Sequence, residues 1–98
     1  MATDKTSRGY SASKEQLHQR LLRIEGQVRG ISRMVDDERY CIDILTQISA
    51  VQAALDRVSL ALLGDHARHC VVGSQSRADR EELTGEMMDA VGRLLGSR

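Results

Sequence analysis

The run from His66 to Cys70 (HARHC) places two histidines and a cysteine within little more than one helical turn. On an α-helix, His66 and Cys70 lie four residues apart on one face, so both side chains can bind the same metal ion. His69 points about 100° away from Cys70, and we expect it to be solvated or to face DNA. Polar helix ends often carry histidines, so this run taken alone is also compatible with an ordinary surface.

Cys41 is the other cysteine of the chain, 25 positions before His66. A continuous helix between these two residues is about 37 Å long, and the sequence offers no break, so one chain cannot bring them together. Two copies paired antiparallel can, because the start of one long helix then lies beside the end of the other. Symmetry makes two such sites in a dimer. The alternative is a pair of unrelated cysteines without a metal.

Two thiolates and one imidazole are soft ligands, which select Cu(I), Zn(II) or similar ions over Mg²⁺ and Ca²⁺. Zinc normally takes a fourth ligand, and three protein ligands with a water are typical of catalytic zinc. A three-coordinate site of this composition therefore fits Cu(I) best.

Three segments with a helical hydrophobic period must position these residues, which predicts an all-α fold. We expect the first helix to begin at Ser13, where Ser13 and Gln16 form a capping box, and to end at the acidic turn 36–38. The second helix covers 41–63 and extends to about Cys70. The third covers 77–95 and is capped by Ser76 and Asp79. The stripes expected to be buried are Leu17, Leu21, Ile24, Val28, Ile31 and Val35; Ile44, Ile48, Val51, Leu55, Val58 and Leu62; and Leu83, Met87, Val91 and Leu94.

The composition limits the size of the core and the class of protein. The 98 residues include no proline, tryptophan or phenylalanine, so an aliphatic core must form, and its small size favours an oligomer. We expect a flexible tail over 1–12 and one helical domain over 13–98. No apolar run approaches the ~20 residues of a membrane span, and the N-terminus lacks a signal peptide, which predicts a cytoplasmic protein without membrane contact.

The formal net charge is zero, but the charges are unevenly distributed. Residues 1–35 carry seven basic side chains against three acidic ones, and residues 79–89 carry five acidic side chains against one arginine. A basic end is compatible with binding of a polyanion, and equally with a solvated helix face.

The segment RLLRIEGQVRGISRMVDDERYCIDILTQISAVQAAL (20–55), followed by H-x-x-x-C, resembles the copper-sensitive operon repressor branch of the CsoR/RcnR transcriptional repressors. The resemblance covers roughly residues 14–95. It implies a three-helix protomer, an antiparallel dimer with a four-helix bundle core, and a dimer of dimers, hence a homotetramer. It also implies that the apo form binds operator double-stranded DNA, and that Cu(I) releases the DNA and derepresses copper-resistance genes.

The resemblance also assigns roles to individual residues. The metal ligands for Cu(I) fall on Cys41, His66 and Cys70. The residues expected around the metal-bound imidazole are Tyr40 and Glu86. The DNA-contacting residues fall on Arg20 and Arg57, with Lys14, Arg23 and Arg29 as supporting contacts; without the resemblance these would be solvated charges.

Other functions leave different signatures. Relatives that sense nickel, cobalt or formaldehyde place a histidine ahead of the first helix, and the stretch TSRGYSASKEQ has none. Persulfide-sensing relatives keep the two cysteines without the histidine, so His66 argues against that chemistry. A copper-storage or chaperone module would not need the arginine-rich first helix. An enzyme is disfavoured, since the chain has no glycine-rich phosphate loop and no nucleophile–base motif.

Overall fold

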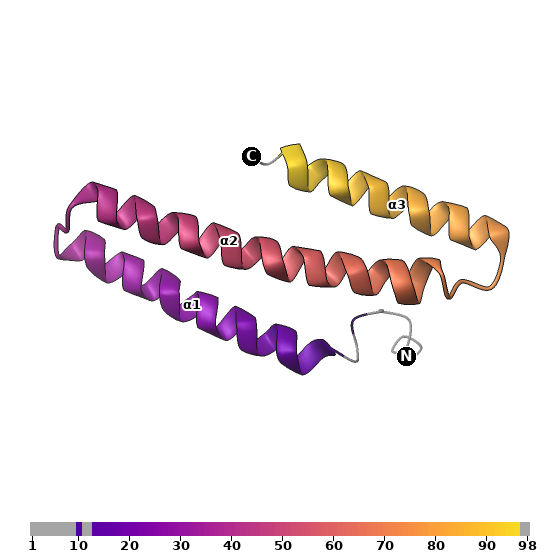
Figure 1. Cartoon of the computed structure of the whole chain (residues 1–98), viewed down its shortest axis with the longest axis horizontal. Coiled ribbons are helices and arrows are strands. Elements are labelled where there is room, and N and C mark those ends of the chain that lie inside the picture. Colours follow the sequence, from indigo (N-terminus) through magenta and orange to yellow (C-terminus); the bar gives the residue numbers. More distant parts are fainter. Residues whose placement is uncertain (1–9, 11–12, 97–98) are drawn as a thin grey trace. The chain divides into compact units, whose positions relative to one another are not determined.

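Figure 1 shows the computed structural model of the chain, which describes residue 10 and residues 13–96. The helices are α1 (Lys14–Asp36), α2 (Cys41–Asp65), the π-helix η3 (His66–Val71) and α3 (Arg77–Gly96). The predicted all-α fold is therefore confirmed. The predicted tail over 1–12 lies outside the described residues, apart from Tyr10.

The chain divides into two compact units. One spans residues 13–60 and holds α1 and most of α2; the other holds the end of α2, η3 and α3. The prediction of one domain over 13–98 stays a prediction. Among the helices of the described chain, none is long and apolar enough to cross a membrane.

Ser13 occupies the N-cap position of α1, as expected, but its side chain makes no capping hydrogen bond. Its backbone, with φ −103° and ψ 5°, lies outside the β region that normally aims an N-cap side chain at the first turn. The predicted capping box between Ser13 and Gln16 is therefore wrong, although the start of the helix is right.

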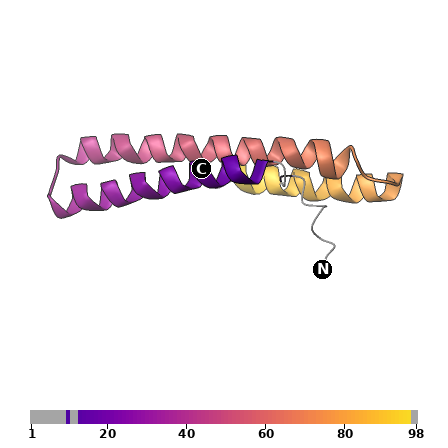
Figure 2. The ribbon, with the colours of Figure 1, turned by 90° about the horizontal axis from the view of Figure 1, so that it is seen from below.

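The turn between α1 and α2 is a Schellman motif. The Glu38 N–H donates to the Val35 carbonyl at 3.0 Å, and the Arg39 N–H donates to the Met34 carbonyl at 3.0 Å. Glu38 has φ 55°, at the left-handed position where glycine is usual. The turn reverses the chain, so that α1 and the first part of α2 run antiparallel (Figures 1 and 2).

The core of the unit over 13–60 is narrow. Leu17 and Ile24 of α1 and Val51 and Val58 of α2 are buried. Each pair is seven residues apart, so an antiparallel register sets Leu17 opposite Val58 and Ile24 opposite Val51. Two helices alone thus cover about one position in each heptad.

Much of the predicted apolar stripe is exposed in the single chain. The stripe residues that are exposed are Leu21, Val28 and Val35 of α1 and Ile48, Leu55 and Leu62 of α2. Ile31 and Ile44 are half-buried. One protomer therefore leaves much of each stripe uncovered, because a second helix covers only one side of a stripe, and burial of the whole stripe stays a prediction that depends on the expected oligomer.

The α3 helix begins as the sequence predicts. The Asp79 N–H donates to Ser76 Oγ at 3.0 Å, which confirms Ser76 as the cap. The helix packs against η3. Of its predicted apolar face, Leu83, Met87 and Val91 are half-buried and Leu94 is exposed, so the expected burial of this face is only partly correct.

Candidate metal centre

The helical path changes type where the candidate ligands lie. After Asp65, the α-helix α2 gives way to the π-helix η3 over His66–Val71. At its end, the Val72 N–H donates to the Ala67 carbonyl, five residues earlier, at 3.0 Å. The sequence correctly predicted a helix to about Cys70, but not its wider turn, which hydrophobic spacing does not reveal. Single π-turns occur frequently at functional sites.

His66 and Cys70 line the same open cavity of about 730 Å³, within the unit that holds η3 and α3. Cys70 is half-buried and forms no disulfide. Among the described side chains, His66 Nε2 is a buried nitrogen without a hydrogen-bond partner. Buried polar atoms are nearly always paired, so an unpaired one calls for an explanation such as a missing ion. A thiol and an unpaired imidazole nitrogen in one cavity fit a soft metal ion.

The opposite wall of this cavity is formed by α3. Asp79, Glu82 and Glu86 all line it, and their spacing of three and four residues places them on one face of the helix. Glu86 therefore borders the same cavity as His66. The family resemblance implied Glu86 as a neighbour of the imidazole, and its role as a partner stays a prediction. His69 is exposed and also borders the cavity, a position that α-helical geometry alone did not predict.

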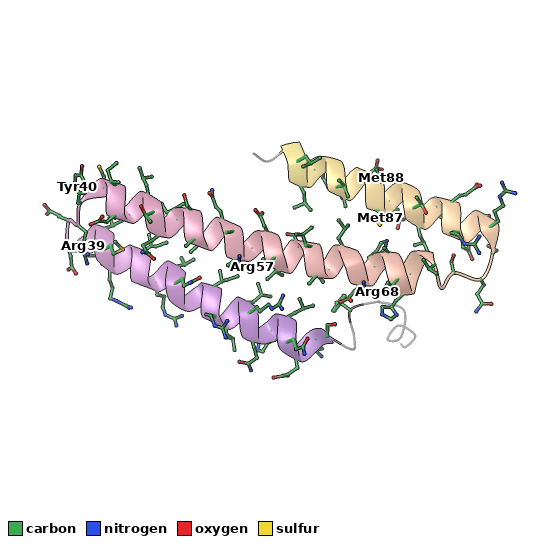
Figure 3. All side chains as sticks on the ribbon, in the orientation of Figure 1. Arg39, Tyr40, Arg57, Arg68, Met87 and Met88 are labelled. Atoms are coloured by element: carbon green, nitrogen blue, oxygen red, sulfur yellow. The ribbon has the colours of Figure 1, made fainter. Side chains whose placement is uncertain are left out.

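Cys41 and Tyr40 stand at the start of α2, in the other unit. The Tyr40 carbonyl accepts hydrogen bonds from the N–H groups of Asp43 and Ile44, so the first turn of the helix fixes both residues. Cys41 is exposed, and Tyr40 is 68 % exposed (Figure 3). Across the described residues, no group of three or more His, Cys, Asp or Glu side chains is placed to hold a metal ion. One protomer thus assembles two of the three predicted ligands.

The basic residues expected to contact DNA belong to the unit over 13–60. Four are on α1 and one is on α2, and all are exposed: Lys14, Arg20, Arg23, Arg29 and Arg57. Exposed arginines on a helix can bind phosphate oxygens without large rearrangement. Figure 3 shows Arg57 on the middle part of α2.

Comparison with known proteins connects the cavity with the basic helix. The family model of the metal-sensitive transcriptional repressors matches residues 13–94. The chain belongs to this family. The resemblance noted in the sequence is thereby confirmed, and the function of these repressors requires both a metal site and a DNA-binding surface.

The chain is also similar to individual metal-sensing regulators. The chain is 56 % identical over 79 residues to the copper-sensing transcriptional repressor CsoR of Bacillus subtilis, covering 81 % of this chain and 78 % of that one. The crystal structure of the copper-sensing repressor CsoR with Cu(I) from Geobacillus thermodenitrificans matches with a TM-score of 0.80 and 48 % identity, over 87 % and 88 % of the two chains. The nickel-responsive transcriptional regulator InrS matches with a TM-score of 0.69 and 38 % identity, over 81 % and 89 %.

Proposed function

We propose that this repressor senses Cu(I) through Cys41 of one protomer and His66 and Cys70 of another, and that Cu(I) binding releases it from operator DNA. The observation that carries the proposal is the buried, unpaired His66 Nε2 in the cavity that Cys70 also lines. Copper is favoured over nickel by the soft ligand set, and the copper-sensing relatives support that choice.

The third ligand comes from a second protomer because α2 is unbroken. The helix runs for 25 residues from Cys41 to Asp65, which corresponds to about 37 Å. An antiparallel dimer with a four-helix core brings Cys41 of one copy to the η3 turn of the other, and dimers pair into a homotetramer. The exposed apolar residues of α1 and α2 support this assembly, since such patches mark interfaces.

Glu86 and Tyr40 serve the imidazole rather than the metal. A metal-bound histidine usually donates its second ring N–H to a polar group, which fixes the ring. Glu86 borders the same cavity as His66 and accepts that hydrogen bond. Tyr40, which directly precedes Cys41, arrives from the second protomer. Through these contacts α3 registers the change at His66.

Operator binding uses the exposed basic residues of α1 together with Arg57. Lys14, Arg20, Arg23 and Arg29 contact phosphates, which position the protein on the duplex. Binding and release of DNA is the whole activity, without an enzymatic step, and it takes place in the cytoplasm. A copper-storage module is disfavoured because the chain belongs to a family of transcriptional repressors.

The test is a titration of anaerobic protein with Cu(I), followed by fluorescence anisotropy of a labelled DNA duplex from the protein's own promoter. We expect tight binding of the apo protein and release when about one Cu(I) per protomer has been added. Ni(II) in a parallel titration should leave the DNA bound. Release by Ni(II) and not by Cu(I) would overturn the proposal.

A further inference from the structure

Among the polar and charged residues that the structure describes, only Asp65 is buried, with 6 % of its surface exposed. It is the last residue of α2, directly before the π-turn. Its carboxylate accepts a hydrogen bond from Arg68 Nη2 at 2.9 Å. A buried carboxylate is costly unless it is paired and hydrogen-bonded, and Arg68, whose own side chain is 67 % exposed, supplies such a partner to the Asp65 carboxylate. We call Asp65 and Arg68 the junction pair.

The guanidinium of Arg68 lies beside Gly64, at ordinary contact distance from where a Cβ would stand. A Cβ built on Gly64 would lie 3.4 Å from Arg68 Nη1 and 3.6 Å from Nη2. The arginine side chain therefore folds back over the end of α2, on which it lies in Figure 3. The junction pair thus ties the last α-helical residue to the third residue of the π-turn.

His66 lies between the two members of the junction pair in the sequence, so the backbone that this pair restrains sets the direction of the imidazole. We infer that Arg68 is a positioning residue: through Asp65 it holds the π-turn so that His66 faces the cavity before metal arrives. This inference rests on the proposed role of His66 as a Cu(I) ligand. A restrained ligand loses less freedom on binding, which is the advantage of a preorganised site.

The chain offers a matched control in a second arginine–carboxylate pair. Arg77 Nε lies 3.4 Å from Glu81 Oε2, and the two side chains are 88 % and 70 % exposed. Exposed pairs of this kind contribute little. Arg77→Gln therefore removes the same charge from a surface helix without touching the π-turn.

The first experiment measures hydrogen exchange of the Val72 amide in the apo protein, because this N–H closes the π-turn onto Ala67. Arg68→Gln should speed its exchange about tenfold. Arg68→Lys should restore most of the protection, because lysine keeps the positive charge beside Asp65. The recovery should be incomplete, because lysine lacks the planar guanidinium. Arg77→Gln should exchange like the wild type. Should Arg68→Gln be poorly folded, Asp65→Asn tests the same pair without leaving a buried charge.

The second experiment follows Cu(I) affinity by chelator competition and operator affinity with and without Cu(I). The two thiolates hold most of the metal affinity, so Arg68→Gln should bind Cu(I) within a few-fold of the wild type. The ratio of operator affinities without and with Cu(I) should fall about tenfold, and Arg68→Lys should recover it. The operator affinity of the apo protein should stay within a few-fold of the wild type in Arg68→Gln, because the junction pair acts on the π-turn and not on the residues that bind DNA.

Two results would overturn the inference. One is wild-type exchange at Val72 together with wild-type coupling in Arg68→Gln. The other is a loss of operator affinity in apo Arg68→Gln as large as the loss of coupling, which would make the junction pair a general support of the fold. A wild-type protein that ignores Cu(I) would instead refute the proposed function, and the Val72 exchange would still decide whether the junction pair orders the turn.

Discussion

At the scale of single residues, the three proposed ligands are not equivalent. Cys41 and Cys70 supply soft sulfur, which can hold Cu(I) in a near-linear site, so Cys41→Ser or Cys70→Ser should lower Cu(I) affinity by several orders of magnitude. Chelator competition under anaerobic conditions measures this. Wild-type affinity in either serine variant would remove that cysteine from the site.

In the proposed mechanism, His66 couples the metal to DNA. Allosteric coupling requires an interaction that differs between the two states, and the His66 Nε2 atom is buried without a partner in the state described here. His66→Ala should therefore bind Cu(I) tightly yet stay on the operator when loaded. Cu(I) affinity and operator affinity, measured on the same protein, test this. Release of DNA as readily as by the wild type would place the switch in the cysteines alone.

Residue types and spacing were sufficient to predict that His66 and Cys70 share one helix face, and the family resemblance implied Glu86 as their neighbour; all three line one cavity. Their roles stay predictions. The junction pair was not predicted, because an aspartate and an arginine three residues apart on a helix are usually a solvated pair. Only the burial of Asp65 sets this pair apart, and burial depends on tertiary packing, which local sequence does not reveal.

At the scale of elements, the bounds of the helices could be predicted closely, because capping and apolar period are local signals. The π-turn could not, since a wider turn depends on packing rather than on the residues' own preferences. The unusual conformation of Glu38 was missed for a related reason. A glycine at this position would have predicted a left-handed conformation. Glu38 adopts that conformation, and a glutamate gives no such signal in the sequence.

Glu38→Gly tests whether that conformation is strained. The left-handed region costs a residue with a Cβ about 1 kcal/mol, so we expect the variant to unfold with a free energy about 0.5–1 kcal/mol higher. Urea denaturation at one fixed protein concentration measures it, because oligomerisation also shifts stability. Glu38→Ala removes the charge but keeps the Cβ and should gain little. Equal gains in both variants would assign the effect to charge.

At the scale of the whole molecule, repetition multiplies weak contacts. Each protomer presents the same exposed basic residues of α1 and α2. Each contact between one of them and a phosphate adds to the salt dependence of DNA binding. Arg20→Ala or Arg57→Ala should weaken operator binding and lower the slope of log affinity against log salt by about one or more, with Cu(I) affinity unchanged. Arg93→Ala, exposed on α3, is the control. Wild-type binding by both test variants would show that the DNA-binding face lies elsewhere.

The assembly itself follows from what one chain leaves uncovered. Only Leu17, Ile24, Val51 and Val58 make up the buried apolar core among the described residues, which is too little to offset the entropy of ordering two long helices. Leu45, 55 % exposed on α2, lies next to Ile44 of the predicted apolar stripe, where we expect a second copy to pack. Light scattering of the wild type at micromolar concentration should therefore give a tetramer. Leu45→Glu should shift the protein to smaller species, because a charge cannot be buried there without a partner. It should also remove the release of DNA by Cu(I).

Gln47→Glu is the matched control, since Gln47 is exposed and polar on the same helix, and it should leave the assembly intact. If Leu45→Glu also stays tetrameric, α2 pairs through another face, and the antiparallel site shared by Cys41 and His66 needs a different register. A wild-type protein that is a stable monomer would have a stronger consequence. The α2 helix separates Cys41 from η3 by its full length, so a monomer could not form the three-ligand site at all, and the metal would have to be held by the cavity of η3 and α3 alone.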